Sequence, residues 1–258
     1  MQSASTIRIS DLTDYQGEAA WRIDTPAAVY VFHKHSAGFA SLIDPAGADW
    51  IRFRPGGGSA GEYRGIPNLG CEQGAFHPGR PGGCRSWIET QAADAVVIRS
   101  ETEDSLWATT WTVSAHRADL VVERTGHPYW FLYEGTPGGN YDENEAYLID
   151  SGGERRSCAS RWERQLPEPR WLYFATPHSA YVLLIADRTE RPADTVDSYW
   201  SMERNMTVFG FGRTLDHDSG RWMHLGNMPS RFTVALLPKQ EPPAMRADIE
   251  RLLDDGKT

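Results

Sequence analysis

The stretch "SLWATTWTVSA" at residues 105–115 decides the fold class of this chain. Large or branched side chains occupy every second position on one side of it, namely Trp107, Thr109, Trp111 and Val113. The positions between them hold Ala108, Thr110 and Thr112. Because successive residues of a strand point to opposite faces, this alternation predicts a β-strand with one buried face.

The same period of two recurs along most of the chain. Further strands are predicted at residues 27–33, 49–53, 95–100, 119–125, 128–134, 170–176, 180–187, 206–213 and 231–238. Turn signals such as "DPAG" and "PGG" separate them, and only "EPPAMRADIERLLDDG" at 241–256 indicates a helix. The sequence therefore predicts an all-β fold, a large antiparallel β-sandwich with a short C-terminal helix, as one domain over residues 1–258.

The composition of the chain limits the classes of molecule that it is expected to bind. A net charge of -9 argues against a nucleic-acid partner and gives no polybasic patch for a membrane surface. Ten Trp, ten Tyr and nine Phe favour a large aromatic core together with flat platforms for sugar rings, so a carbohydrate is the expected partner. Neither the oligomeric state nor the compartment is indicated. The latter is cytoplasmic if the N-terminus is native, and secreted or periplasmic if a signal peptide was removed.

Several chemical signatures are absent from the sequence. It contains no glycine-rich nucleotide motif, no H-E-x-x-H and no G-x-S-x-G, so we expect no cofactor. Cys71, Cys84 and Cys158 have no C-x-x-C spacing. Cys71 and Cys84 form a disulfide, or all three are free buried thiols; the sequence leaves both possibilities open.

The segment "GEYRGIPNLGCEQGAFHPG" at 61–79 carries many reactive side chains on a glycine-rich, proline-broken loop, which is typical of a site loop. Arg64 can form a forked pair with a carboxylate, Asn68 can bind the same group, and His77 titrates near neutrality. Such side chains suit neutralising a uronate and removing its C5 proton. In the alternative interpretation, Arg64 pins the loop through Glu62 or Glu72, and His77 is a hydrogen-bonded turn histidine.

A second cluster is "YWFLYEGTPGGNYDENEAY" at 129–147. Trp130, Leu132 and Glu134 would share one strand face, so Glu134 leaves the sheet at the strand end. Tyr133 and Tyr141 are nearby candidates for proton donors. The alternative is a solvated acidic loop. We expect the 54–86 and 135–145 loops to line one cleft.

A third cluster is "DSYWSMERNMTVFGFGR" at 197–213, where Tyr199 and Trp200 form a candidate stacking pair. Glu203 offers a carboxylate and Arg213 a cation, while a purely structural role is the alternative for Trp200. A fourth cluster, His33-Lys34-His35, would place two imidazoles on one strand face. Completing a metal site needs Glu72, His77 or Glu203, and the predicted chemistry requires no ion, so no metal is expected.

The acidic, Trp-rich, many-stranded chain with polar clusters on long loops resembles the galactose-mutarotase-like supersandwich group. That group includes sugar epimerases, polysaccharide lyases and parts of glycoside hydrolases. The segments "DWIRF", "GEYRGIPNLG", "FHPG" and "YWFLYEGTPGG" also resemble uncharacterised bacterial polysaccharide-degradation proteins. The mutarotases' His-Gly motif with its downstream acid is not found, so the resemblance carries over no catalytic residue.

Together these features predict an enzyme that cleaves glycosidic bonds of an acidic poly- or oligosaccharide by β-elimination. Arg64 and Asn68 would neutralise the uronate, His77 would act as base, and Tyr133 or Tyr141 as acid. The predicted substrate-binding residues are Tyr63, Glu72, Trp130, Tyr199, Trp200 and Arg213. The alternatives are a hydrolase using Glu134 and Glu203, a non-catalytic sugar-binding module, and a metal-dependent β-barrel enzyme with His33 and His35.

Overall fold

The computed structural model describes residues 6–59, 63–71, 83–126, 129–190, 195–212, 214–216, 221–223 and 229–254. The alternating stretch forms β8 (Ala108–Ser114), within a nine-stranded antiparallel sheet. In it Trp111 pairs with Ile98 on one neighbouring strand and with Leu120 on the other. The Trp111 ring is fully buried, with its centroid 4.5 Å from that of Phe39 in another sheet. The predicted buried face of this strand is confirmed.

The described residues form three larger antiparallel sheets and one hairpin. In spatial order, the nine-stranded sheet contains β12 (Arg155–Ser157), β11 (Tyr147–Asp150), β14 (Trp171–Ala175), β15 (Tyr181–Asp187), β20 (Ser230–Pro238), β9 (Ala118–Arg124), β8, β7 (Ala95–Thr102) and β6 (Cys84–Gln91). The five-stranded sheet contains β13 (Trp162–Arg164), β16 (Asp197–Met202), β17 (Met206–Phe211), β10 (Tyr129–Gly135) and β5 (Asn68–Cys71). The four-stranded sheet contains β1 (Arg8–Tyr15), β2 (Glu18–Asp24), β3 (Val29–His33) and β4 (Gly38–Ile43), and the hairpin is β18 (Thr214–Asp216) with β19 (Arg221–Met223).

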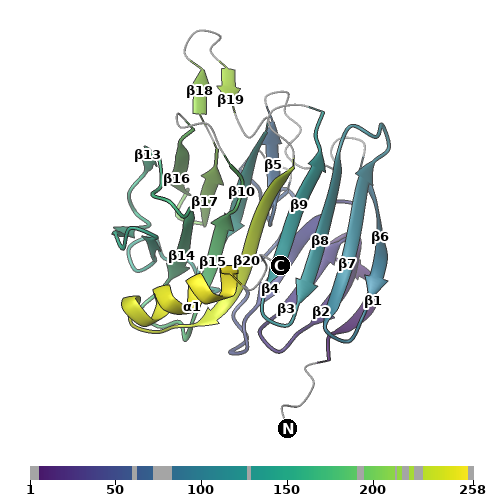
Figure 1. Ribbon diagram of the computed structural model, residues 1–258, viewed down its shortest axis with the longest axis horizontal. Helices are drawn as coiled ribbons and strands as arrows, with labels where there is room; N and C mark the ends of the chain where they lie inside the picture. The colour runs from purple at the N-terminus through teal and green to yellow at the C-terminus, as the bar shows by residue number, and fades with distance from the viewer. Residues whose placement is uncertain are drawn as a thin grey trace.

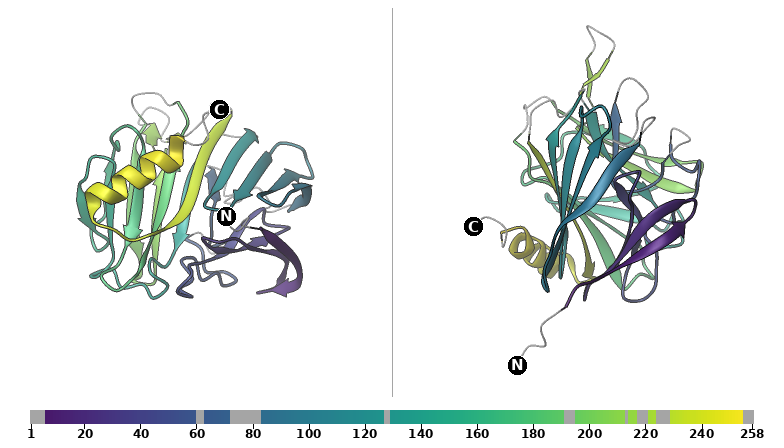
Figure 2. Two further views of the ribbon diagram at one scale, coloured as in Figure 1. Left: turned by 60° about the horizontal axis from the view of Figure 1, so that its bottom comes forward. Right: turned by 90° about the vertical axis from the view of Figure 1, so that its right-hand side faces the viewer.

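The sheets stack as layers. Figures 1 and 2 show the nine-stranded sheet in the middle, with the four- and five-stranded sheets against one face and the helix α1 (Pro242–Asp254) against the other. Phe131 of β10 stacks on Phe232 of β20 with ring centroids 4.4 Å apart, which joins two of the layers. The all-β sandwich with a C-terminal helix is therefore confirmed. The structure also contains nine of the ten predicted strands.

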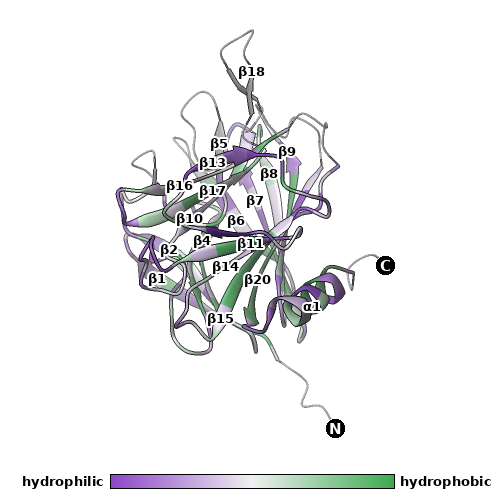
Figure 3. Ribbon diagram, turned by 90° about the vertical axis from the view of Figure 1, so that its left-hand side faces the viewer, coloured by the Kyte–Doolittle hydropathy of each residue, from purple (hydrophilic) through white to green (hydrophobic). Residues whose placement is uncertain are grey.

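Helix α1 covers the outer face of the nine-stranded sheet. It starts at Pro242, a residue type that suits the first turn because it lacks an N–H that would be unsatisfied there. Met245 and Ile249 lie four residues apart, are fully buried and pack on Tyr173 and Leu184. In Figure 3 the helix shows a hydrophobic and a hydrophilic side, as expected for one that buries a single stripe. No helix among the described residues has both the length and the apolar character needed to cross a membrane.

The predicted strand at 49–53 is wrong. Asp49 forms only an isolated bridge with Ile43. Its carboxylate instead accepts hydrogen bonds from the backbone N–H groups of Leu42 and Ile51 and from the Ser41 hydroxyl. The backbone of Arg52 is left-handed, with φ 52°. An aspartate that binds nearby backbone groups, followed by a left-handed residue, produces a turn although the residue pattern alternates.

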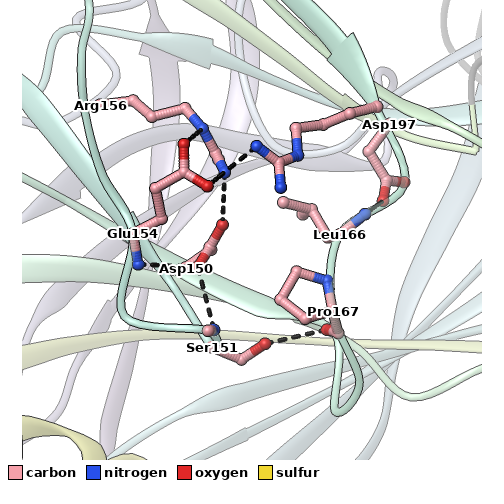
Figure 4. Close-up of polar contacts among 9 residues, drawn as sticks. Asp150, Ser151, Glu154, Arg156, Leu166, Pro167 and Asp197 are labelled. Carbon is pink, nitrogen blue, oxygen red and sulfur yellow. Dashed lines mark hydrogen bonds and ion pairs between the residues drawn. The ribbon is translucent and has the colours of Figure 1, made fainter.

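The long segment at 151–168 has a structural role. Asp150 accepts backbone hydrogen bonds from Gly152 and Glu154 and pairs with Arg156 at 2.8 Å (Figure 4). Further along the segment, the Leu166 N–H donates to the buried carboxylate of Asp197 at 3.3 Å. Asp150 belongs to the nine-stranded sheet and Asp197 to the five-stranded one. The segment therefore ties two layers together.

Candidate functional site

A pocket of about 440 Å³ lies where the end of β10 meets the 49–54 segment and the β16–β17 turn. Its arginines are Arg52, Arg54, Arg64 and Arg204. Among the described residues that line it, Asp49 is the only acid. Because the protein as a whole carries a net charge of -9, this cationic concentration is local and favours an anionic ligand. We call it the arginine pocket.

The arginine pocket is shared by the two loops that the sequence predicts to line one cleft. Arg54 and Arg64 come from the 54–86 segment, and Thr136, Asn140 and Tyr141 come from the 135–145 segment. The backbone N–H of Glu134, the residue immediately before the second segment, donates to the Gly65 carbonyl at 3.1 Å. The predicted proximity of the two loops is confirmed.

Arg64 is the buried cation of the pocket, with only 2% of its surface exposed. Its Nε donates to the Ile51 carbonyl at 2.8 Å, whereas its Nη2 has no hydrogen-bond partner among the described residues. Burial lowers the pKa of the guanidinium, and the nearby Tyr133 and Glu134 act in the opposite direction. A buried donor without a partner is costly, and a bound carboxylate would satisfy it.

Glu134 is the penultimate residue of β10, on the outer face of its sheet as predicted, and its carboxyl is fully buried. Oε1 accepts the Ser59 N–H at 3.1 Å, and Oε2 accepts the Asn68 amide at 3.3 Å. Burial raises the pKa of Glu134 to about 7, against the effect of these hydrogen bonds and of the Arg64 charge. Gly58 permits this approach, because a Cβ there would collide with the Tyr63 carbonyl and lie 3.0 Å from Oε2.

Asn68 differs from its predicted role. It is fully buried, and its amide donates to Glu134 and to the Tyr63 carbonyl, the latter at 3.1 Å. The side chain does not line the arginine pocket. Asn68 therefore holds Glu134 in place and does not face a uronate.

The candidate tyrosines separate into buried and accessible ones. Tyr133 is fully buried and its hydroxyl donates to the Trp50 carbonyl at 2.6 Å, so the predicted role as proton donor is wrong for Tyr133. Tyr199 is also fully buried, with its hydroxyl donating to the Cys158 carbonyl at 2.8 Å, and is no stacking platform. Tyr141 is half-buried and lines the arginine pocket, with its hydroxyl 3.1 Å from that of Tyr199. Burial raises the pKa of Tyr141, which keeps its phenol protonated at neutral pH.

The other predicted aromatic contacts lie in different surroundings. Tyr63 is 2% exposed and packs on Phe53, with centroids 5.2 Å apart, so it belongs to the core instead of a binding surface. Trp130 is almost fully buried on the outer face of the five-stranded sheet, in a small cluster with Val208. Trp200 is half-buried beside this cluster, on the outer face to which Glu134 also points.

Glu62, Glu72, His77 and Arg213 lie outside the described residues. Glu203 is described, and it is an exposed turn residue that does not line the arginine pocket. Its neighbour Arg204 does.

The predicted pair of histidines does not share a strand face. His33 ends β3, is fully buried and packs edge-on against Phe53 at 4.6 Å, whereas His35 is exposed in the following turn. The left-handed backbone of Ala37, with φ 56°, helps to turn the chain here. Within the described ranges no group of three or more His, Cys, Asp or Glu side chains could hold a metal ion.

Cys84 and Cys158 are free, buried thiols, and burial raises the pKa of each to about 12. Of the two possibilities left open by the sequence, the Cys71–Cys84 disulfide is therefore not formed. A thiol with so high a pKa is a poor nucleophile at neutral pH.

Sequence reasoning missed Arg52, Arg54 and Arg204 as pocket residues. A signal for the first two was present in "RFRPGGG" at 52–58, where two arginines lead into a glycine-rich turn. The alternating pattern of "DWIRF" directed attention to a strand instead. Arg204 had no signal beyond its position beside Glu203.

The fold resembles that of solved galactose mutarotase-like proteins. A galactose mutarotase related enzyme from Lactobacillus acidophilus matches with a TM-score of 0.54 and 9% identity, over 86% of this chain and 98% of that one. A galactose mutarotase-like protein from Clostridium acetobutylicum matches with a TM-score of 0.54 and 8% identity, over 92% and 99% of the two chains. A protein designated HI1317 gives a TM-score of 0.58 at 9% identity, over 90% and 99%. The chain thus has the galactose-mutarotase-like fold that its sequence features suggested.

No protein-family model and no curated protein sequence matches the chain. At such low identity the structural likeness establishes the fold alone, because one fold hosts many chemistries. Function has to be argued from the arginine pocket and the residues around it.

Proposed function

We propose that this protein cleaves glycosidic bonds of an acidic, uronate-containing poly- or oligosaccharide by β-elimination in the arginine pocket. The observation that carries the proposal is the buried Arg64, which has a guanidinium nitrogen without a hydrogen-bond partner in the described part of the chain and lines the same pocket as the protonated phenol of Tyr141. A carbohydrate substrate is also in keeping with the names of the structural neighbours, two of which are described as mutarotase-related or mutarotase-like.

Arg64 pairs with the uronate carboxylate and withdraws charge from C5, which makes the C5 proton more acidic. A base removes that proton, its electron pair forms the C4–C5 double bond, and the C4–O bond breaks. Tyr141 gives its proton to the departing oxygen, which leaves a hydroxyl on one product and an unsaturated uronate on the other. His77 remains the predicted base and lies outside the described residues.

The decisive test is the formation of unsaturated uronate. Wild-type protein is incubated with a panel of uronate-containing polysaccharides and with their carboxyl-reduced, neutral counterparts, and ultraviolet absorbance is followed. We expect absorbance to rise only with an acidic substrate. Arg64→Lys should lower kcat/KM on that substrate by at least tenfold, because a lysine keeps the charge but loses the forked geometry. New reducing ends without absorbance would indicate hydrolysis instead, and binding without either product would indicate a sugar-binding module.

Chelation provides an independent expectation. Arg64 and Tyr141 supply the charge neutralisation and the proton without an ion. We therefore expect prolonged EDTA treatment followed by gel filtration to leave the elimination rate within about twofold of the untreated protein. Loss of activity that one divalent ion restores would contradict the proposed mechanism and favour the metal-dependent alternative.

A hydrolase is the second candidate, because Glu134 has the property expected of a general acid. Its pKa of about 7 keeps part of the population protonated at neutral pH. An inverting or retaining mechanism requires a second carboxylate across the bond. Neither Glu134, which is fully buried, nor its predicted partner Glu203 lines the pocket, whereas Asp49 does. Elimination on a uronate gives the four arginines of the pocket a role, whereas hydrolysis of a neutral sugar would give them none.

A further inference from the structure

The turn between β16 and β17 has an unusual sequence for its geometry. Glu203 and Arg204 have φ angles of 50° and 55°, and the Asn205 N–H closes the turn on the Met202 carbonyl at 2.9 Å. Within the three-residue loop between the paired Met202 and Met206, Glu203 and Arg204 are the two central positions of a β-turn. A β-turn with positive φ at both central positions strongly prefers Asn-Gly, because other residues are strained there. Turn geometry alone therefore does not account for Glu-Arg at this place.

Arg204 extends from this turn to the arginine pocket, which it lines together with Arg64 and Tyr141. Its Nε lies 3.1 Å from Oε1 of Glu143. The side chain of Glu143 is 15% exposed, whereas that of Arg204 is 83% exposed. Ion pairs with so exposed a partner are weak, so a stronger carboxylate acceptor can replace Glu143.

Backbone strain gathers around the same pocket. Six non-glycine residues in the described part of the chain have positive φ, and three of them, Gln16, Arg52 and Arg204, line it. Strained residues cluster at functional sites, where the surrounding structure holds them in place. Two of these three residues are arginines, so the strained backbone positions place positive charges at the pocket.

We infer that Arg204 is a specificity-determining residue that leaves Glu143 and binds the substrate's carboxylate in a forked pair. This inference rests on the proposed function, since it names a second contact for the acidic substrate. Arg64 holds the anion from the buried side, while Arg204 approaches from the exposed turn. Glu143 keeps the guanidinium over the pocket until the substrate arrives, and competes with it.

Binding measurements test this without depending on cleavage. Isothermal titration is performed with short oligomers of galacturonate, mannuronate and glucuronate, each beside its carboxyl-reduced counterpart. Arg204→Ala should bind the preferred acidic oligomer at least tenfold more weakly than wild type, with unchanged affinity for the reduced one. Arg204→Lys should not restore binding, because it lacks the fork. The matched control is Arg161→Ala, since Arg161 forms a comparable exposed ion pair with Glu163 at 3.0 Å outside the pocket.

Two further variants separate recognition from a structural role. Glu143→Gln removes the internal competitor and should bind the acidic oligomer roughly two- to fivefold more tightly. The double substitution Glu203→Asn with Arg204→Gly supplies the preferred turn residues, so Tm should rise by about 2–4 °C while affinity falls at least tenfold. A merely structural arginine would not produce these opposite changes.

The inference is overturned if Arg204→Ala binds the acidic oligomer as tightly as wild type does. If wild type binds the acidic oligomer but yields no unsaturated product, elimination is wrong, and the same affinities still decide the role of Arg204. If wild type binds acidic and reduced oligomers equally, the acidic substrate and the role of Arg204 both fail.

Discussion

Tyr141→Phe is expected to lower kcat for elimination by about 10²–10⁴-fold, the usual effect of removing a positioned proton donor. The substitution removes one oxygen and keeps the ring that fills this side of the pocket. KM should change little, because Arg64 and Arg204, not the phenol, bind the carboxylate. Initial rates on the preferred uronate substrate, measured by ultraviolet absorbance across a range of concentrations, separate kcat from KM.

The stability of Tyr141→Phe should stay close to that of wild type. Tyr199 keeps its hydrogen bond to the Cys158 carbonyl and lies 3.2 Å from the Thr207 hydroxyl, so no buried donor is stranded. Tyr147→Phe is the control, because Tyr147 lies on β11 outside the pocket. A Tyr141→Phe enzyme with wild-type kcat would remove Tyr141 from the mechanism, and no accessible phenol among the predicted residues would remain to replace it.

The layers of the fold could be predicted because they rest on local alternation. Trp111 and Val113 are buried in the nine-stranded sheet as their spacing indicates. The alternation failed at Asp49, where a carboxylate bound to nearby N–H groups changed the backbone path. It also missed β1, whose residues are mostly exposed and so show no clear apolar face.

Part of the site could also be predicted from local sequence patterns. Arg64 and Tyr141 could be identified because they lie on polar segments that are unsuited to form buried strands. Both residues line the arginine pocket. Their burial could not be foreseen, and burial is what separates Tyr141 from Tyr133. Arg204 could not be found, because its role depends on a turn that brings it beside Glu143, far away in sequence.

Replacing Glu134 by Gln should change the pH dependence of stability by roughly 3 kcal/mol, the equivalent of a pKa raised from 4.5 to about 7. Between these two pH values the unfolded chain has lost the proton and the folded protein keeps it. Protonated Glu134 therefore contributes its full stabilisation to the wild-type free energy of unfolding below pH 4.5. This stabilisation is lost as the pH rises through about 7, where the folded protein also gives up the proton. Glutamine does not titrate, so the variant lacks this loss.

The free energy of unfolding of both proteins is measured by urea denaturation at about pH 4.5 and about pH 8. The change between the two pH values in the variant, minus the change in wild type, is a double difference that reports Glu134 alone, because the contributions of all other titrating groups cancel. We expect Glu134→Gln to gain roughly 3 kcal/mol relative to wild type between the two pH values. Glu89→Gln, at an exposed position on β6, should show no such gain. A double difference near zero for Glu134→Gln would mean that the folded protein holds Glu134 ionised at neutral pH. In that case Glu134 could not serve as the general acid of a hydrolase, and its carboxylate would act only as the acceptor that fixes Ser59 and Asn68 beside the pocket.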